Sequence, residues 1–214
     1  MPPAEQHPAA HPAAQSARQG RRREAARRML AEGLSLMARR GVHACHVEEI
    51  TAAAGVGKGT FFTHFATKEA FVAALVDQVL SDLARRVRPL GLGPADGESL
   101  LAGVGTVHLR YFQLRPEAAA LLTQACGLDQ DGPAGQQVRQ RLSDHLDMVA
   151  AMLAPAAGQL GWPAEHGREL ALAMLALSCG FFWFGRPLGL GRESPAALLD
   201  RLGRLAAQGL ARRD

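Results

Sequence analysis

Several side chains between residues 58 and 68 have the chemistry needed to bind a nucleic acid. Lys58 and Lys68 are the only two lysines of the chain, and Thr60, Thr63 and His64 lie between them. Ammonium groups bind phosphates, whereas hydroxyl and imidazole groups can contact phosphates or the edges of bases. This segment is therefore a candidate for contact with the major groove of DNA.

Two short helices joined by a tight turn would position these side chains. Residues 47–54 form a short helical run that Gly55 is expected to end, and a second helical run follows over residues 58–65. Ala53 and Ala54 are small enough for a close helix crossing. The side chains expected to fill the core against the preceding helix are Val56, Phe61 and Phe65. This arrangement is typical of a helix-turn-helix, whose second helix enters the major groove.

The remaining sequence predicts helices on both sides of this motif. Residues 22–40 have an amphipathic pattern that ends at Gly41, and a long helix is expected from Thr67, as N-cap, to about Arg88. Glycine and proline clusters divide the rest into four or five helical segments, and no segment alternates with period two. We therefore predict an all-α fold of about nine helices: an N-terminal three-helix helix-turn-helix head on a C-terminal helical bundle.

The charge distribution supports this division. The net charge is +4, and the first 70 residues carry ten lysines and arginines against six acidic residues, whereas the rest of the chain is balanced. A basic head on a neutral body is typical of a nucleic-acid binder whose remaining mass has another role. The predicted domains are a disordered tail over 1–20, the DNA-binding head over 21–67 and a ligand-binding and dimerisation domain over 68–214.

Six arginines near the N-terminus leave two interpretations open. They could form an arm that follows phosphates or enters the minor groove, or they could be one solvated face of a helix. The residues are Arg18, Arg21, Arg22, Arg23, Arg27 and Arg28.

Other chemistries find weaker support in the sequence. Residues 55–60 resemble a phosphate-binding loop, but such a loop needs a glycine where Ala52 stands and follows a strand. His43, Cys45 and His46 could ligate a metal, yet no second cluster of matching spacing completes a zinc site. No catalytic set can be assembled. We predict no enzyme activity, no cofactor and no metal.

The head resembles the TetR family of bacterial regulators over roughly residues 22–75. The resemblance rests on Ile50-Thr51-Ala52-Ala53-Ala54-Gly55-Val56-Gly57-Lys58-Gly59-Thr60-Phe61-Phe62-Thr63-His64-Phe65-Ala66-Thr67-Lys68-Glu69. It implies a DNA-binding set made of Val47, Glu48, Lys58, Gly59, Thr60, Phe62, Thr63, His64 and Lys68. Two departures remove hydroxyl groups: Phe62 stands where the family usually has tyrosine, and Cys45-His46-Val47 stand where it usually has threonine or serine.

The resemblance also implies partners for the body. The two C-terminal helices, here about 163–184 and 195–211, would form a homodimer, and the middle helices would hold a small-molecule effector that releases a repressor from its double-stranded DNA operator. The candidate ligand-binding residues are His108, Tyr111, Phe112, Gln124, Met148, Met152 and Trp183. The alternative is a helix-turn-helix adaptor whose body binds a protein partner.

Two further features concern the environment of the chain. The longest uncharged apolar stretch, 170–184, is too short to span a bilayer, and no export signal is visible. Cys45, Cys126 and Cys179 are an odd number without paired spacing, which indicates reduced thiols that serve as small core residues. We therefore expect a cytoplasmic protein without membrane contact.

Overall fold

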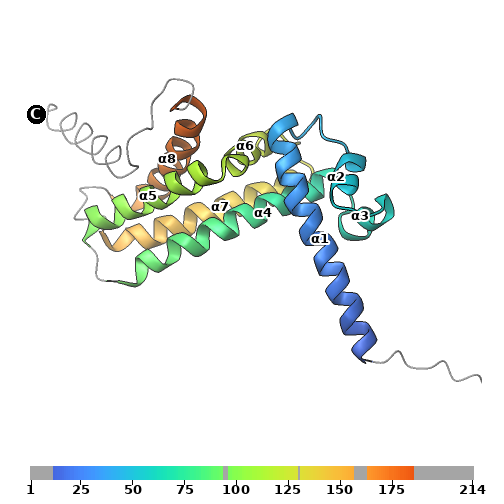
Figure 1. Cartoon of the computed structure of the whole chain (residues 1–214). Coiled ribbons are helices and arrows are strands. Elements are labelled where there is room, and N and C mark those ends of the chain that lie inside the picture. The colour runs from blue at the N-terminus through green and yellow to red at the C-terminus, as the bar shows by residue number, and fades with distance from the viewer. Residues whose placement is uncertain (1–11, 94–95, 130, 157–162, 186–214) are drawn as a thin grey trace, which may run out of the picture.

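The computed structural model describes residues 12–93, 96–129, 131–156 and 163–185, and within these ranges the regular structure is entirely helical (Figure 1). This confirms the predicted all-α fold. The longer helices are α1 (Pro12–Arg40), α4 (Lys68–Val87), α5 (Gly97–Leu114), α6 (Pro116–Ala125), α7 (Pro133–Leu153) and α8 (Gly167–Gly180), and the two short ones of the head are α2 (Val47–Ala53) and α3 (Lys58–His64). Single helical turns lie at η1 (Arg88–Leu92), η2 (Ala154–Ala156), η3 (Ala164–His166) and the π-helical η4 (Phe181–Gly185).

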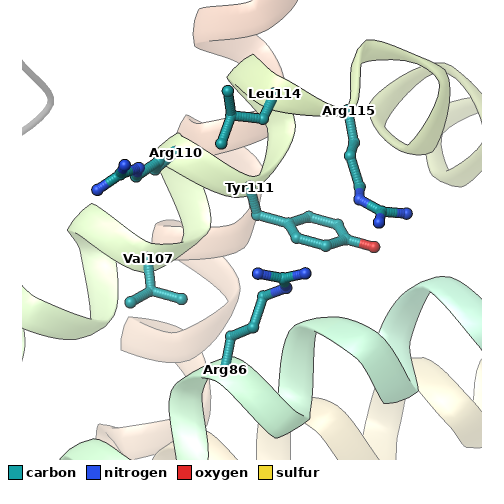
Figure 2. Close-up of a pocket in the computed structure, with 6 residues that line it drawn as sticks. All are labelled: Arg86, Val107, Arg110, Tyr111, Leu114 and Arg115. Carbon is teal, nitrogen blue, oxygen red and sulfur yellow. The ribbon is translucent and has the colours of Figure 1, made fainter.

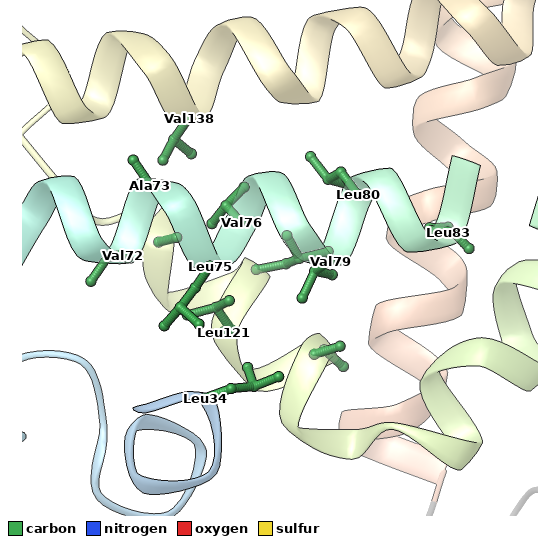
Figure 3. Close-up of a cluster of buried hydrophobic side chains, with 14 of the residues drawn as sticks. Leu34, Val72, Ala73, Leu75, Val76, Val79, Leu80, Leu83, Leu121 and Val138 are labelled. Carbon is green, nitrogen blue, oxygen red and sulfur yellow. The ribbon is translucent and has the colours of Figure 1, made fainter. Parts of the chain in front are cut away.

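Helix α4 is the central element of the molecule. The Thr67 hydroxyl caps its N-terminus by accepting a hydrogen bond from the Ala70 backbone N–H at 3.0 Å, and Glu69 lies in its positively polarised first turn. Its apolar residues face α6 on one side and α7 on another, where Leu75 and Val79 are almost fully buried (Figure 3). Because α4 contributes to the cores of both head and body, the hydrophobic core is continuous between them.

Helices α1 and α4 approach each other closely at Gly33. A Cβ atom at this position would lie 2.4 Å from Cζ of Phe71, so only glycine fits without displacement of that ring. The helices of the head are therefore locked onto the start of α4, and the predicted boundary between residues 67 and 68 stays a prediction.

Helix α1 begins earlier than expected. The sequence predicted a tail over residues 1–20 and a helix from about residue 22, but α1 starts at Pro12 and its residues 16–24 are exposed. Alanine, arginine and glutamine have high helix propensity, and proline is favoured in the first turn, so this segment can extend the helix without tertiary packing. Residues 12–20 of the predicted tail are therefore helical, and residues 1–11 lie outside the described part.

The cysteines and the predicted C-terminal helix differ in how far the structure describes them. Of the cysteines, Cys45 is buried and Cys179 half-buried, but Cys126 is exposed, so the prediction of three core cysteines was wrong for Cys126. Its position directly after α6, at a turn, accounts for this exposure. The predicted last helix, 195–211, lies outside the described residues. None of the described helices is both long and apolar enough to cross a bilayer.

Candidate nucleic-acid interface

The turn between α2 and α3 depends on Gly55. Its φ angle is +63°, in the left-handed region that glycine adopts without strain. The N–H groups of Gly55 and Val56 donate to the carbonyls of Ala52 and Thr51 at 3.1 and 2.9 Å, which satisfies the end of α2. The geometry confirms the predicted role of Gly55 as the residue that ends the first short helix.

Aromatic rings hold α3 against the rest of the head. Phe61 is fully buried, and its ring centroid lies 5.2 Å from that of Phe71 on α4 and 5.4 Å from that of Phe65. Val56 and Phe65 are partly buried against the same cluster, as the sequence predicted. Ala54 is buried at the helix crossing, but Ala53 is exposed, because the two lie on different sides of the helix end. The packing fixes the outward face of α3.

That outward face carries the residues predicted to bind DNA. Lys58, Gly59, Phe62 and Thr63 are exposed, and Thr60 and His64 are half-buried. The Thr63 hydroxyl donates to the Gly59 carbonyl of its own helix at 2.8 Å. Phe62 leaves almost half of its surface exposed on the same face.

Charged groups at the edges of α3 are held by neighbouring residues. Lys58 forms an ion pair with Glu48 of α2, and this contact lowers the pKa of the Glu48 carboxyl. The Lys68 ammonium donates to the backbone carbonyl of His43 at 3.0 Å, which brings the start of α4 beside the loop before α2. Both lysines can exchange these solvent-exposed contacts for phosphates, since exposed pairs contribute little net free energy.

Glu49 shapes the start of α2. Its carboxylate accepts a hydrogen bond from the His46 backbone N–H at 2.9 Å and forms an ion pair with Arg40 at the end of α1. Val47 and Glu48 therefore lie between two residues, His46 and Glu49, that are joined by this hydrogen bond. Val47 is half-buried and Glu48 is exposed. Thus the nine residues predicted to bind DNA all lie on α2, α3 or the first turn of α4.

The arginines near the N-terminus lie on the exposed part of α1, which projects away from the body in Figure 1. Arg27 forms an ion pair with Glu24 at 2.7 Å, and the guanidinium of Arg28 lies beside the Gly55 turn. These positions add positive charge next to the helix-turn-helix.

The seven residues predicted to bind a ligand do not gather in one cavity. His108 and Phe112 are core residues, Gln124 accepts a hydrogen bond from the Val42 backbone N–H at 2.7 Å, and Met152 packs near Gly91. The remaining three, Tyr111, Met148 and Trp183, line three different pockets. Apolar and polar residue types at helical spacing could not indicate which helix faces meet, and the ligand-binding role of these residues stays a prediction.

A larger cavity lies between α6, α7 and α8, and sequence reasoning missed it. Its volume is about 900 Å³, and its walls combine apolar side chains with a few polar ones. The residues include Leu142, Leu146, Leu175, Cys179, Gln140, Ser143 and Arg168. Their regular spacing on α7 and α8 resembles that of any core-facing helix, so no sequence signal set them apart.

A buried pair of histidines joins α5 and α7. The Nδ1 atom of His108 lies 2.8 Å from the Val104 carbonyl oxygen, so it carries the proton and donates. The Nε2 atom of neutral His108 must then accept from Nε2 of His145, at 3.0 Å. This leaves Nδ1 of His145 buried without a hydrogen-bond partner among the described residues. Burial, followed by the proximity of His108, lowers the pKa of His145 to about 4.

Known proteins resemble the head in sequence and the whole described chain in fold. Residues 29–75 match the family of bacterial regulatory proteins called the tetR family. The HTH-type transcriptional repressor DhaR of Mycobacterium sp. (strain GP1) is 39% identical over 59 residues, which are 28% of this chain and 30% of that repressor. The chain therefore matches less than a third of the length of this relative.

Solved structures resemble the chain over most of its length. FadR from Bacillus subtilis, solved in complex with stearoyl-CoA, has a TM-score of 0.68 at 17% identity, covering 83% of this chain and 95% of FadR. AibR, solved with isovaleryl coenzyme A and operator DNA, has a TM-score of 0.67 at 17% identity, covering 85% and 97%. At this identity the likeness concerns the fold. The sequence match to the tetR family covers residues 29–75, which include α2, α3 and the first part of α4.

Proposed function

We propose that this chain is a dimeric transcription regulator that binds an operator through α3 and changes its DNA affinity when a small molecule binds the helical body. The observation that carries the proposal is the outward face of α3, where polar side chains surround an exposed Phe62 while Phe61 anchors the helix from behind. A face of this kind fits the major groove, and two copies related by a two-fold axis would contact adjacent turns of DNA.

The apolar outer face of α8 supports dimerisation. Leu177 is 59% exposed and Phe184 in η4 is 70% exposed, whereas Leu172, also more than half exposed, lines the cavity between α6, α7 and α8. Met174, by contrast, faces the intramolecular core, although the sequence pattern grouped it with the predicted dimer helix. Exposed apolar side chains of this size on one helix are typical of a subunit interface.

The cavity between α6, α7 and α8 supports a small-molecule effector over a protein partner. This pocket of about 900 Å³ is open to solvent, concave and lined mostly by apolar surface, as ligand sites of this size are. FadR and AibR were solved with coenzyme A thioesters, which makes this class of compound the first to test. Ligand binding would favour a spacing of the two heads that does not match adjacent major grooves.

DNA binding is tested with a labelled duplex that covers the upstream region of the gene, compared with random duplex at two salt concentrations. We expect a strong sequence preference and a steep dependence on salt. Thr63→Ala should weaken specific binding about tenfold. Thr106→Ala is the control, because it removes the same groups from a helix of the body, α5. Absence of binding at low salt would refute the proposal.

The effector is tested by titrating isovaleryl-CoA and stearoyl-CoA into the complex with the operator. Release of the DNA is expected for a compound that fits the cavity. Leu146→Trp should reduce this release by filling the cavity, whereas Leu92→Trp, at an exposed position on η1, should not. Release that is equally strong in both variants would place the effector site elsewhere.

A further inference from the structure

A second, smaller pocket opens between α4 and α5 and has an unusual concentration of arginine. Its volume is about 320 Å³, and it is lined by Arg86 from α4, by Val107, Arg110, Tyr111 and Leu114 from α5, and by Arg115 from the junction with α6 (Figure 2). No carboxylate belongs to these described lining residues. Its walls therefore combine three cations with two aliphatic side chains and one aromatic ring.

Tyr111 keeps two of these cations in place. The guanidinium carbons of Arg86 and Arg115 lie 5.7 and 5.8 Å from the centroid of its ring, within the range of cation–π contacts. The Tyr111 hydroxyl donates to the Val79 carbonyl at 3.3 Å, which fixes the ring against α4. Burial, and then the nearby charge of Asp82, raise the pKa of Tyr111 to about 12, so this hydroxyl remains a neutral donor.

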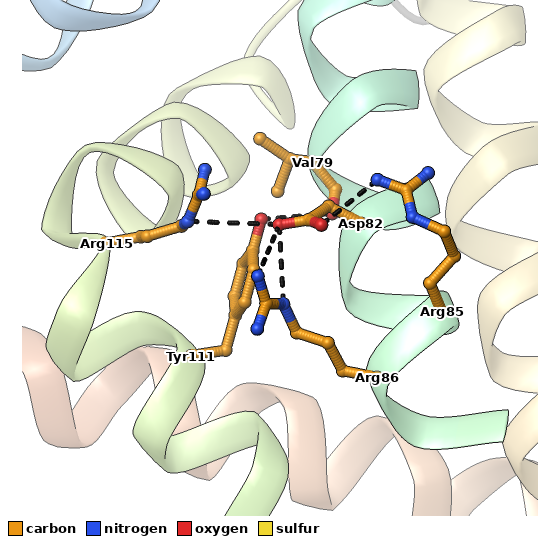
Figure 4. A network of polar contacts seen from close by, with 6 residues as sticks. All are labelled: Val79, Asp82, Arg85, Arg86, Tyr111 and Arg115. Atoms are coloured by element: carbon orange, nitrogen blue, oxygen red, sulfur yellow. Dashed lines mark hydrogen bonds and ion pairs between the residues drawn. The ribbon is translucent and has the colours of Figure 1, made fainter. Parts of the chain in front are cut away.

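The nearest carboxylate, Asp82, does not neutralise the cluster. Its closest ion pair is with Arg85 at 3.0 Å, and the distances to Arg86 and Arg115 are 3.5 and 3.8 Å (Figure 4). Burial acts to raise the pKa of Asp82, but the surrounding arginines outweigh it and lower the pKa, so the group is ionised. One negative charge is thus shared among three guanidinium groups.

Arg110 adds a further positive charge at the pocket. It is exposed and forms no hydrogen bond or ion pair with any residue that the structure describes. Its side chain starts on the side of Val107 and Leu114 and extends outward, away from Arg86 and Arg115, so it would have to turn inward to reach an anion in the pocket (Figure 2). Leu114 itself is 72% exposed, which leaves an apolar surface next to free donors.

We propose that this pocket is a binding site for the anionic group, phosphate or carboxylate, of a small molecule whose adjoining part is apolar. Guanidinium groups present several donors in one plane and bind both kinds of anion by paired hydrogen bonds. Arg86 and Arg115 would bind the anion beside the Tyr111 ring, Arg110 would close on it from the opposite side, and Val107 and Leu114 would contact the apolar part.

The position of the pocket connects it to the DNA-binding head. Arg115 immediately precedes Pro116, the first residue of α6, and α6 packs against α1. Gln124, at the other end of α6, accepts a hydrogen bond from the Val42 backbone N–H just after α1. A bound anion that draws Arg115 inward would therefore act on the helix that supports the head. This last step rests on the proposed function, whereas anion binding itself does not.

The site is tested by calorimetric titration of the DNA-free, full-length protein with pyrophosphate and, separately, with octanoate. Arg110→Gln and Arg86→Gln should each weaken binding about tenfold. Arg22→Gln, which removes the same charge from an exposed position on the projecting part of α1, should leave it unchanged. Asp82→Asn should strengthen binding severalfold, because it frees Arg86 and Arg115. Thermal melting of each variant establishes that it is folded.

Each outcome decides the proposal. Binding of pyrophosphate identifies a phosphate site and binding of octanoate a carboxylate site, provided that the losses in Arg86→Gln and Arg110→Gln are larger than in Arg22→Gln. Absence of binding by both probes, equal losses in all arginine variants, or weaker binding by Asp82→Asn would overturn it. Because these titrations contain no DNA, a failure here leaves operator binding unaffected, and a failure of operator binding leaves this result intact.

Discussion

Single residues decide the geometry of the DNA-binding head. Gly55 adopts a φ angle that side chains with a Cβ rarely adopt, and Gly57, two residues later, has an ordinary φ of −77° as the N-cap of α3. Both glycines are exposed and lie in the same turn. Comparing alanine substitutions at the two positions therefore distinguishes the cost of backbone strain from the general effect of replacing a glycine.

Gly55→Ala is expected to lower the free energy of unfolding by about 1–2 kcal/mol, the cost of a left-handed conformation for a residue with a Cβ. Gly57→Ala should change it by less than about 0.5 kcal/mol, because a Cβ there meets open space. Urea unfolding followed by circular dichroism measures both values. Equal losses in the two variants would contradict the role assigned to the turn.

His145 makes stability depend on pH. Its pKa is about 4 in the folded protein, below the ordinary value of 6.5, so the unfolded chain binds the proton more tightly. The contribution to stability is therefore complete above pH 6.5 and is lost as the pH falls from 6.5 towards 4, by up to about 3 kcal/mol.

The unfolding free energy measured between pH 7 and 4 checks this expectation. His145→Gln should make the profile shallower in this range, because an amide does not titrate and can still donate to His108, whose pKa is itself lowered by burial and which keeps its own contribution. His43→Gln, at an exposed position before α2, is the control and should leave the profile unchanged. A wild-type profile that is flat down to pH 4 would refute the expectation.

At the scale of the element, α3 is a helix with two opposite functions. It has only seven residues, too few to be stable alone, so its position depends on tertiary packing. Phe61 faces inward with no exposed surface, and Phe62 faces outward with 48% of its surface exposed. Two adjacent phenylalanines thus separate the anchoring of the helix from its proposed contact with DNA.

Phe61→Ala should lower the unfolding free energy by about 3–5 kcal/mol, the range for a buried phenylalanine. Phe62→Ala should change it by less than about 1 kcal/mol but weaken operator binding, since the exposed ring would lose its contact with the duplex. Thermal melting and a DNA-binding titration on both variants measure the two effects. If Phe62→Ala bound the operator as wild type does, α3 would have to approach DNA with another face.

At the scale of the whole molecule, the proposed regulator works as a pair of chains. Helix α8 leaves Leu177 exposed, and η4 adds Phe184, so the apolar surface continues beyond the end of the helix. This surface lies on the body, far along the chain from the head. Assembly of two bodies would set the distance between two copies of α3.

Leu177→Asp is expected to shift the protein from dimer to monomer in analytical ultracentrifugation, because a buried, unpaired carboxylate is strongly unfavourable at an interface. Operator affinity should fall with it, since each monomer would bind only one half-site. Leu92→Asp, at a leucine of η1 that is 89% exposed, is the matched control and should remain dimeric. A Leu177→Asp variant that stays dimeric would remove this face of α8 from the interface.

The sequence by itself determined the head. Three of its features could be predicted because they depend on interactions between residues close in sequence. These are the turn at Gly55, the N-cap at Thr67 and the alternation of buried and exposed phenylalanines. The all-helical class followed from composition and periodicity for the same reason. The early start of α1 at Pro12 was missed because proline and histidine nearby suggested disorder, although the following alanines and arginines favour a helix.

Only the tertiary structure decided where the body could bind a ligand. Arg86 and Arg115 converge on Tyr111 because α4 and α5 cross at a particular angle and register, and His108 meets His145 across 37 residues of sequence. Helical periodicity predicts that a residue faces the core, but it does not predict which residue of another helix it contacts. The choice among possible helix pairings depends on side-chain volumes and packing throughout the core, so neither pocket could be predicted from sequence spacing.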